Sequence, residues 1–280
     1  MERKIAFIGV GNMADAIISG IMSQVDNTIK GDDIILYNRH REKISRYECQ
    51  NMYIASSVYD AVERADCVIL AVKPQNFPEV LPLISEVPEV DKKLFISIAA
   101  GVSIKTICDM ANASRVVRVM PNTPMMVGKG VSAICRSKAV SDDEFDFAAS
   151  IFKASGDVIS INEDEMNRII SVTGSSPAYV FMFIKAIYNG AVDQGLLKFG
   201  DSDSSLSERE LLDAICNTVI GAAQLMKQGN KTPDEQIKTV CSKGGTTEKA
   251  VDHLISCDFE STISDAMKKC TERADELSRN

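Results

Sequence analysis

In the first part of the chain, short apolar runs alternate with amphipathic stretches at helical spacing. This alternation is typical of strand–helix units, in which parallel strands are buried between two layers of helices. We therefore predict a doubly wound α/β domain over residues 1–162. The expected strands are residues 4–9, 34–38, 67–72, 94–99, 116–120, 131–135 and 157–161, and the expected helices are 12–23, 41–47, 57–65, 76–84, 104–110 and 141–154.

From residue 163 the apolar positions follow helical spacing almost throughout. Two helix starts carry a capping box, Ser207 with Glu210 and Thr232 with Glu235, and Pro233 takes the first helical position of the second. We predict an all-helical domain over residues 163–280, with helices at 163–174, 177–195, 208–228, 233–241, 247–256 and 259–277. Broad apolar faces on these helices favour pairing with a second copy, whereas a self-contained bundle is the alternative.

The first expected strand runs directly into Gly9-x-Gly11-x-x-Ala14. Gly9 permits a tight turn, Gly11 leaves no Cβ between the backbone and a ligand, and Ala14 lets the following helix pack close to the strand. The N-terminus of that helix can then bind a pyrophosphate. Because a strand precedes the motif and a helix follows it, the pattern predicts a dinucleotide cofactor. A turn that contains glycines for steric reasons alone is the alternative.

The second expected strand ends at Asn38 and is followed by Arg39, His40 and Arg41. A protein that binds NAD would offer a carboxylate here to the ribose 2′-hydroxyl. Since Arg39 can instead pair with a 2′-phosphate, we predict NADP; solvated arginines at a helix start are the alternative. Lys73, at the end of the next expected strand, is a further candidate for contact with the cofactor, with a plain surface lysine as the alternative.

In the helical domain, residues 240–248 read Val-Cys-Ser-Lys-Gly-Gly-Thr-Thr-Glu. Two glycines free the backbone where one helix ends, and Thr246 and Thr247 open the next helix with exposed N–H groups. Such a helix start can bind a small anion such as a carboxylate, and the Thr247 hydroxyl adds a donor or acceptor. A helix-to-helix turn with threonine caps is the alternative.

Composition and charge narrow the classes of function. A formal net charge of −8 argues against nucleic acid and anionic membranes as partners. The eight cysteines form no CxxC pair, so we expect neither disulfides nor a metal site. With only two histidines, a histidine-assisted nucleophile is disfavoured. The chain shows neither a signal peptide nor a run of about 18 unbroken apolar residues, so we expect a cytoplasmic protein.

Taken together, these segments resemble the pyrroline-5-carboxylate reductase family, which reduces a cyclic imino acid to proline. The resemblance covers nearly the whole chain. It rests on residues 7–13, 71–74, 99–102, 120–124, 174–179 and 242–247.

The resemblance implies an NADPH-dependent reductase, with NADH as an alternative donor, built from an N-terminal Rossmann domain and a C-terminal helical dimerisation domain. It implies a homodimer or a larger ring of dimers, in which the helical loop of one subunit faces the cofactor domain of another. The family's cofactor site falls on Gly9, Val10, Gly11, Asn12, Met13, Asn38, Arg39, Val72, Lys73 and Ala100. Its substrate site falls on Val240, Ser242, Gly245, Thr246 and Thr247, with Thr247 also close to the ring nitrogen as the catalytic residue.

The function expected from this resemblance is reduction of L-1-pyrroline-5-carboxylate to L-proline, the last step of proline biosynthesis. The chain departs from the family at Ser176, where glycine is usual, and at Lys243, where proline is usual. Two alternatives therefore stay open: a paralogous reductase of another cyclic imine or oxo acid, and a protein that binds NADP without catalysis.

Overall fold

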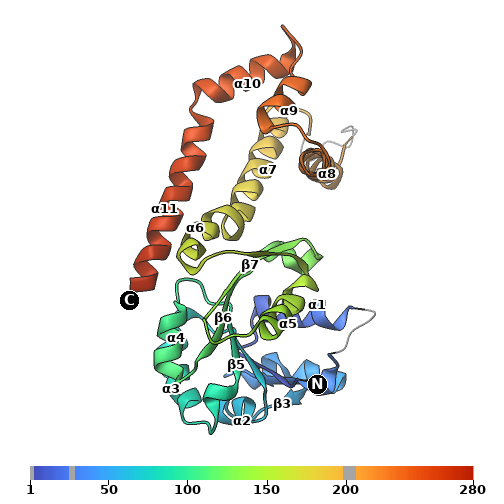
Figure 1. Ribbon diagram of the computed structural model, residues 1–280. Coiled ribbons are helices and arrows are strands. Elements are labelled where there is room, and N and C mark those ends of the chain that lie inside the picture. The colour runs from blue at the N-terminus through green and yellow to red at the C-terminus, as the bar shows by residue number, and fades with distance from the viewer. Residues whose placement is uncertain (1–2, 25–28, 198–205, 280) are drawn as a thin grey trace. The chain divides into compact units, whose positions relative to one another are not determined.

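The computed structural model describes residues 3–24, 29–197 and 206–279 (Figure 1). The chain divides into two compact units. The first comprises Met1–Ser175 together with Lys268–Asn280, and the second comprises Ser176–Met267. We call them the sheet unit and the helical unit. The domain boundary expected at residue 162 stays a prediction.

The sheet unit contains an eight-stranded sheet in the order β3-β2-β1-β4-β5-β6-β7-β8. The strands are β1 Ile5–Ile8, β2 Ile34–Tyr37, β3 Tyr53–Ile54, β4 Cys67–Leu70, β5 Leu94–Ser97, β6 Arg115–Met120, β7 Gly130–Arg136 and β8 Gly156–Ser160. The helices of this unit are α1 Asn12–Met22, α2 Val58–Glu63, α3 Phe77–Ser85, α4 Ile104–Ala111, α5 Asp142–Lys153 and α6 Met166–Ile169.

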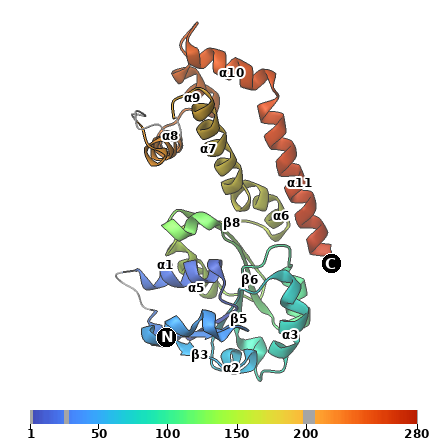
Figure 2. The same ribbon diagram turned by 180° about the vertical axis from the view of Figure 1, so that it is seen from behind.

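Helices cover both faces of this sheet (Figures 1 and 2). Alternate residues of β1 point to opposite sides: Ile5 and Phe7 join the core beneath α1 and α5, and Ala6 and Ile8 join the core beneath α2, α3 and α4. All four are fully buried. This doubly wound arrangement confirms the predicted fold class.

One pair of strands departs from the expected parallel arrangement. β7 runs antiparallel to β6, with Val117 opposite Arg136. Residues 121–129 connect the two strands through a short 3₁₀ segment, Thr123–Val127. A parallel connection needs about a dozen residues or more, so this loop is long enough only for a reversal of direction. β8 then returns parallel to β7 after α5.

Three local expectations also need correction. Residues 41–47 do not form an α-helix but lie in the short 3₁₀ segments Arg41–Lys43 and Ser45–Gln50, which Ile44 separates. The buried side chains here are only Ile44 and Tyr47, so the segment lacks the apolar face that would hold a longer helix against the sheet. The two-residue strand β3 was not expected, because it is too short to show a pattern. The helix expected over 163–174 is divided into a 3₁₀ turn, α6 and a π-helical turn at Ile170–Gly174.

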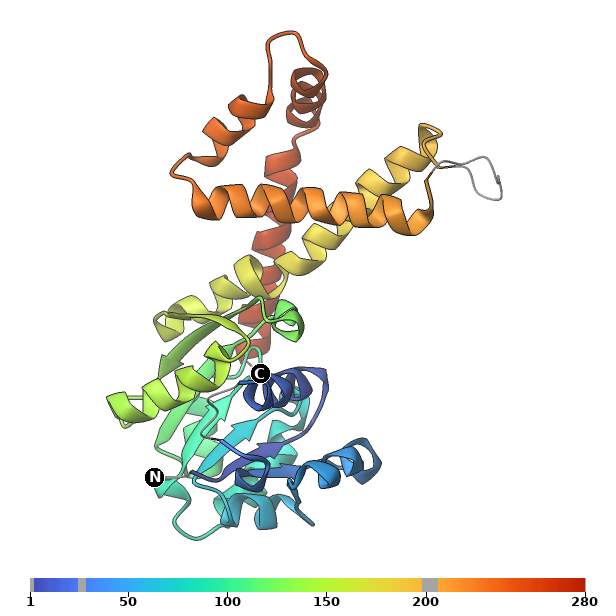
Figure 3. The ribbon, with the colours of Figure 1, turned by 90° about the vertical axis from the view of Figure 1, so that its right-hand side faces the viewer.

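The helical unit holds α7 Ser176–Asp193, α8 Glu208–Gln228, α9 Pro233–Val240, α10 Thr246–Ser256 and the start of α11 Phe259–Arg279 (Figure 3). Both predicted capping boxes are present, at Ser207 and at Thr232. The buried core that the structure describes here is small and consists of Leu197, Leu211 and Ile215. Large apolar side chains of α7 stay exposed, among them Phe181 and Met182.

Candidate functional site

The turn after β1 can be formed only by glycine at position 9. Gly9 has a φ of +88°, and its N–H donates to the carbonyl oxygen of Tyr37 in β2 at 2.8 Å. A Cβ added here would lie 2.7 Å from Cγ1 of Val72. Such an approach forces a shift, since the neighbouring atom lies well inside van der Waals contact.

Gly11, in contrast to Gly9, has open space around it. It is exposed, and a Cβ added to it would meet no atom within 4 Å. The protein itself therefore does not require glycine at this position, whereas a ligand approaching the backbone would. Open space beside a bare backbone at a helix start fits the pyrophosphate of a dinucleotide.

The first turn of α1 presents its N–H groups at this open face. Gly11 is the N-cap and has no side-chain capping bond, and the first intrahelical bond runs from Asp15 N to Gly11 O at 2.9 Å. The N–H groups of Asn12 and Met13 precede that bond, as in every α-helix start, and together with the helix dipole they attract an anion.

Asp15 carries a negative charge in the same turn. Its carboxylate accepts hydrogen bonds from the Arg46 guanidinium and the Tyr47 hydroxyl. Burial, followed by the hydrogen bond to Asp15, raises the pKa of Tyr47 to about 12. The phenol thus stays protonated as a donor, and Arg46 compensates the carboxylate charge close to the anion site.

Asn38 links the loops that follow β1 and β2. Its side-chain oxygen accepts from Val10 N at 3.1 Å, and its side-chain nitrogen donates to the carbonyl of His40 at 2.9 Å. One amide therefore holds both loops in place. Arg39 follows directly, with its guanidinium exposed and paired with the Glu79 carboxylate of α3.

The remaining candidate cofactor residues follow β4 and β5. Val72 packs its side chain against Gly9, and the exposed Lys73 caps the short turn Pro74–Asn76. Ala100 precedes Gly101, which has a φ of +75° and lies close to Leu277 of α11. The candidate cofactor residues are therefore brought together at the carboxyl ends of four adjacent strands, β2, β1, β4 and β5.

The candidate substrate residues form one loop and helix start in the helical unit. α9 ends at the exposed Val240, and Gly244 has a φ of +72°. Gly245 is the N-cap of α10, and its N–H donates to Ser242 O at 2.9 Å. A Cβ on Gly245 would lie 2.4 Å from Oγ of Ser242, which can rotate away, and 3.0 Å from the backbone oxygen of Ser242, so the turn is tight at this position.

The start of α10, like that of α1, has no side-chain cap. The N–H groups of Thr246 and Thr247 precede the bond from Lys249 N to Gly245 O at 3.3 Å. Thr246 is exposed and Thr247 is half-buried. The carboxylate of Glu248 accepts from Gly244 N at 2.7 Å and so occupies a neighbouring donor. The geometry supports binding of a small carboxylate at the two threonine N–H groups.

Sequence reasoning missed two acidic residues at these sites, Glu79 beside Arg39 and Glu248 beside the threonine loop. Glu248 could have been found, because an acidic residue in the first turn of a helix is a common partner for local N–H groups. Glu79 could not, since 40 positions separate it from Arg39.

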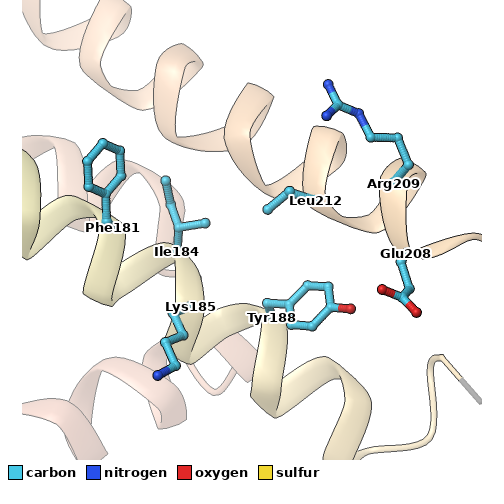
Figure 4. Close-up of a pocket in the computed structure, with 7 residues that line it drawn as sticks. All are labelled: Phe181, Ile184, Lys185, Tyr188, Glu208, Arg209 and Leu212. Carbon is cyan, nitrogen blue, oxygen red and sulfur yellow. The ribbon is translucent and has the colours of Figure 1, made fainter. Parts of the chain in front are cut away.

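A groove of about 570 Å³ lies elsewhere in the helical unit, between α7 and α8 (Figure 4). It is lined mainly by apolar side chains and contains none of the predicted site residues. The lining residues are Phe181, Ile184, Lys185, Tyr188, Glu208, Arg209 and Leu212. In the part of the chain that the structure describes, no three His, Cys, Asp or Glu side chains group closely enough to hold a metal ion.

The two parts of the chain match two different family models. Residues 4–101 match the family of NADP oxidoreductases described as coenzyme F420-dependent, and residues 163–277 match the dimerisation domain of pyrroline-5-carboxylate reductase. The fold and the glycine turn thus define an oxidoreductase of the nicotinamide-dinucleotide class.

Full-length relatives specify the family. The chain is 31% identical to pyrroline-5-carboxylate reductase of Escherichia coli (strain K12), with 100% of each chain covered. A solved structure of a pyrroline-5-carboxylate reductase from Coxiella burnetii matches with a TM-score of 0.86 and 31% identity, again over 100% of both chains. The Plasmodium falciparum pyrroline carboxylate reductase with NADP bound matches with a TM-score of 0.86 and 26% identity, over 99% of this chain and 98% of that one. This chain belongs to the pyrroline-5-carboxylate reductase family.

Proposed function

We propose that this protein reduces L-1-pyrroline-5-carboxylate to L-proline, with NADPH as the hydride donor. One observation carries the proposal: the chain matches a reductase of this family from end to end. The starts of α1 and α10, which have no side-chain caps, support it. When bound, NADPH supplies the hydride that reaches C5 of the ring. The protein contributes mainly placement of the two reactants.

At the cofactor side, the N–H groups at the start of α1 bind the pyrophosphate next to the bare backbone of Gly11. Arg39 pairs with the adenosine 2′-phosphate. Val72, Lys73 and Ala100 line the path toward the nicotinamide from the ends of β4 and β5. Asn38 contributes by holding the loop at Val10.

At the substrate side, the N–H groups of Thr246 and Thr247 bind the ring carboxylate, and Val240 and Ser242 shape the loop beside it. The Thr247 hydroxyl holds the ring nitrogen. Because a protonated imine already carries positive charge, hydride transfer needs no strong acid from the protein. This agrees with a chain that contains only two histidines.

The active form is a homo-oligomer, a dimer or a ring of dimers, in which the threonine loop of one subunit completes the site of another. The exposed apolar side chains of α7 and the groove between α7 and α8 support this assembly, because water-exposed apolar surface of this kind favours burial against a second copy.

The apolar character of the helical stretch Glu163–Asp193 also concerns the cellular location of the protein. The helical stretch Glu163–Asp193 is long and apolar enough, by length and composition, to cross a membrane. One such stretch is a weak indication, since core helices of soluble proteins meet the same test. We propose that a second subunit covers this surface and that the enzyme acts in the cytoplasm.

The test is an assay of imine reduction with NADPH at neutral pH and of proline oxidation with NADP at high pH. The five-membered imino acid is expected to turn over, and a six-membered imino acid to react much more slowly. Preference for the six-membered ring would favour a paralogous reductase, an alternative motivated by Ser176 at the start of α7 and by the exposed Lys243. NADPH binding without turnover of either imine would favour a protein that only binds the cofactor.

A further inference from the structure

Arg39 already has a carboxylate beside it. Its Nη2 contacts Oε1 of Glu79, which lies in the first turn of α3. The side chains of Arg39 and Glu79 are 61% and 62% exposed. An ion pair this open to water is weak and is readily screened by salt, so a ligand can displace it.

The neighbouring arginines are paired in the same way. Arg41 contacts Glu48 with an N–O distance of 3.3 Å, and Arg46 contacts Asp15. Each arginine between positions 39 and 46 therefore has a carboxylate partner. The segment that follows β2 looks strongly basic in the sequence but carries compensated charge in the fold.

We propose that Glu79 is a specificity residue that lowers the preference of this enzyme for NADPH over NADH. The inference rests on the proposed NADPH site at Arg39. A 2′-phosphate carries a charge of about −1.5 to −2 at neutral pH, so it must share Arg39 with a carboxylate of the same sign. The 2′-hydroxyl of NADH brings no charge and can donate a hydrogen bond to that carboxylate.

The two residues thus act in opposite directions on one position of the cofactor. Arg39 favours the phosphate, and Glu79 both occupies Arg39 and repels the phosphate. Arg39 alone would predict a strict NADPH enzyme, whereas Arg39 paired with Glu79 predicts an enzyme that also accepts NADH at useful concentrations.

The test measures the Kd of NADPH and of NADH for the full-length protein and for Glu79→Gln, which keeps the shape of the side chain and removes its charge. We expect the variant to bind NADPH about three- to tenfold more tightly than the wild type does, because the substitution removes both a weak exposed ion pair and a like-charge repulsion. We expect the variant to bind NADH no more tightly than the wild type does. Raising the salt concentration should shrink the difference, since both groups are exposed.

Glu86→Gln is the matched control, because Glu86 is an exposed glutamate at the C-terminal end of the same helix and its substitution changes the net charge equally. It should leave the ratio of the two Kd values unchanged. Arg39→Ala should weaken NADPH roughly tenfold or more while leaving NADH nearly unaffected. The melting temperature of each variant confirms that it is folded.

Two results in Glu79→Gln would overturn this inference without affecting the proposed function. One is an unchanged ratio of the two Kd values. The other is weaker NADPH binding, which would mean that Glu79 positions Arg39 for the phosphate. Wild-type protein that binds neither dinucleotide would overturn the proposed function and this inference with it. Binding of both dinucleotides, with a ratio that shifts toward NADPH only in Glu79→Gln, supports the inference.

Discussion

At the residue scale, the two glycines of the cofactor turn have different reasons to be glycine. Gly9 is required by the fold, since a Cβ would collide with Val72 and its φ is +88°. Gly11 is not required by the fold, because nothing in the protein occupies the space beside it, and the proposed pyrophosphate site gives a reason for glycine there. The motif in the sequence shows both glycines but does not distinguish these causes.

This difference predicts two separate outcomes. Gly9→Ala should lower the stability of the protein by about 1–3 kcal/mol, because it strains the backbone and moves Val72. Gly11→Ala should lower stability by at most about 1 kcal/mol, the cost of a poorer N-cap, while weakening NADPH binding strongly. Thermal unfolding and NADPH titration of both variants check this, and a Gly11→Ala protein with unchanged NADPH affinity would place the pyrophosphate elsewhere.

Thr247 gives a prediction for the substrate side. Thr247→Ala should reduce kcat/KM for the imine about tenfold or more, since a hydrogen bond to a charged group is lost, and should leave the Kd of NADPH nearly unchanged. Thr247→Ser retains the hydroxyl and serves as the control, with most of the activity expected to return. An unaffected rate in Thr247→Ala would remove its hydroxyl from the reaction.

At the scale of elements, the sequence predicted the helices and strands that are specified by neighbouring residues, such as capping residues and apolar spacing. α8 begins and ends at Glu208 and Gln228 as expected, because a capping box sets its start and helical spacing runs through it. The direction of β7 depends on the length of the preceding loop, residues 121–129, which the apolar pattern of the strands does not reveal. The π-helical turn at Ile170–Gly174 has no pattern in the sequence that separates it from an α-helix.

In the candidate site, too, the features set by neighbouring residues could be predicted and the contacts between distant residues could not. Glycine turns and helix starts are contiguous in the sequence, so the residues at Gly9–Met13 and Gly245–Thr247 could be predicted. The partners of Arg39 and Asp15 come from segments 40 and 31 positions away. Charge compensation at the site therefore required the folded structure.

The start of α2 gives a prediction on pH. Asp60 accepts hydrogen bonds from Arg64 at 2.6 Å and from Ser56 N at 2.9 Å, and Arg64 first of all lowers the pKa of Asp60 from 3.8 to about 2. A lowered pKa in the folded state contributes stability that is present above pH 3.8 and is lost as the pH falls through about 2.

The measurement is the melting temperature between pH 5 and pH 2, compared for wild type and Asp60→Asn. The wild type should lose stability more steeply over this range, and the two curves should converge near the acid end. Parallel curves would show that the carboxylate has the same pKa in the folded and unfolded chains.

At the scale of the whole molecule, assembly is expected to decide activity. Phe181 in α7 is 64% exposed, so Phe181→Glu should leave a subunit folded but place a charge in any interface that covers α7. We expect a smaller assembly by light scattering, NADPH binding that is retained and imine reduction that is largely lost. Tyr59→Glu, on the exposed side of α2, is the control and should alter neither assembly nor activity. A fully active monomer would contradict the shared site.

The second half of α11 belongs to the sheet unit, although it is synthesised after the helical unit. Asp275 and Ser278 of α11 accept hydrogen bonds from Asn167 at 2.9 and 3.0 Å, and Asn167 in turn accepts one from the buried Arg118 of β6. The unit that begins with β1 is therefore completed by residues that are translated after the whole helical unit. While the ribosome is still making the chain, the cofactor turn and the sheet can form, but the network around this buried arginine stays incomplete until α11 emerges. Loss of residues 268–279 would therefore weaken the unit whose strands are synthesised first.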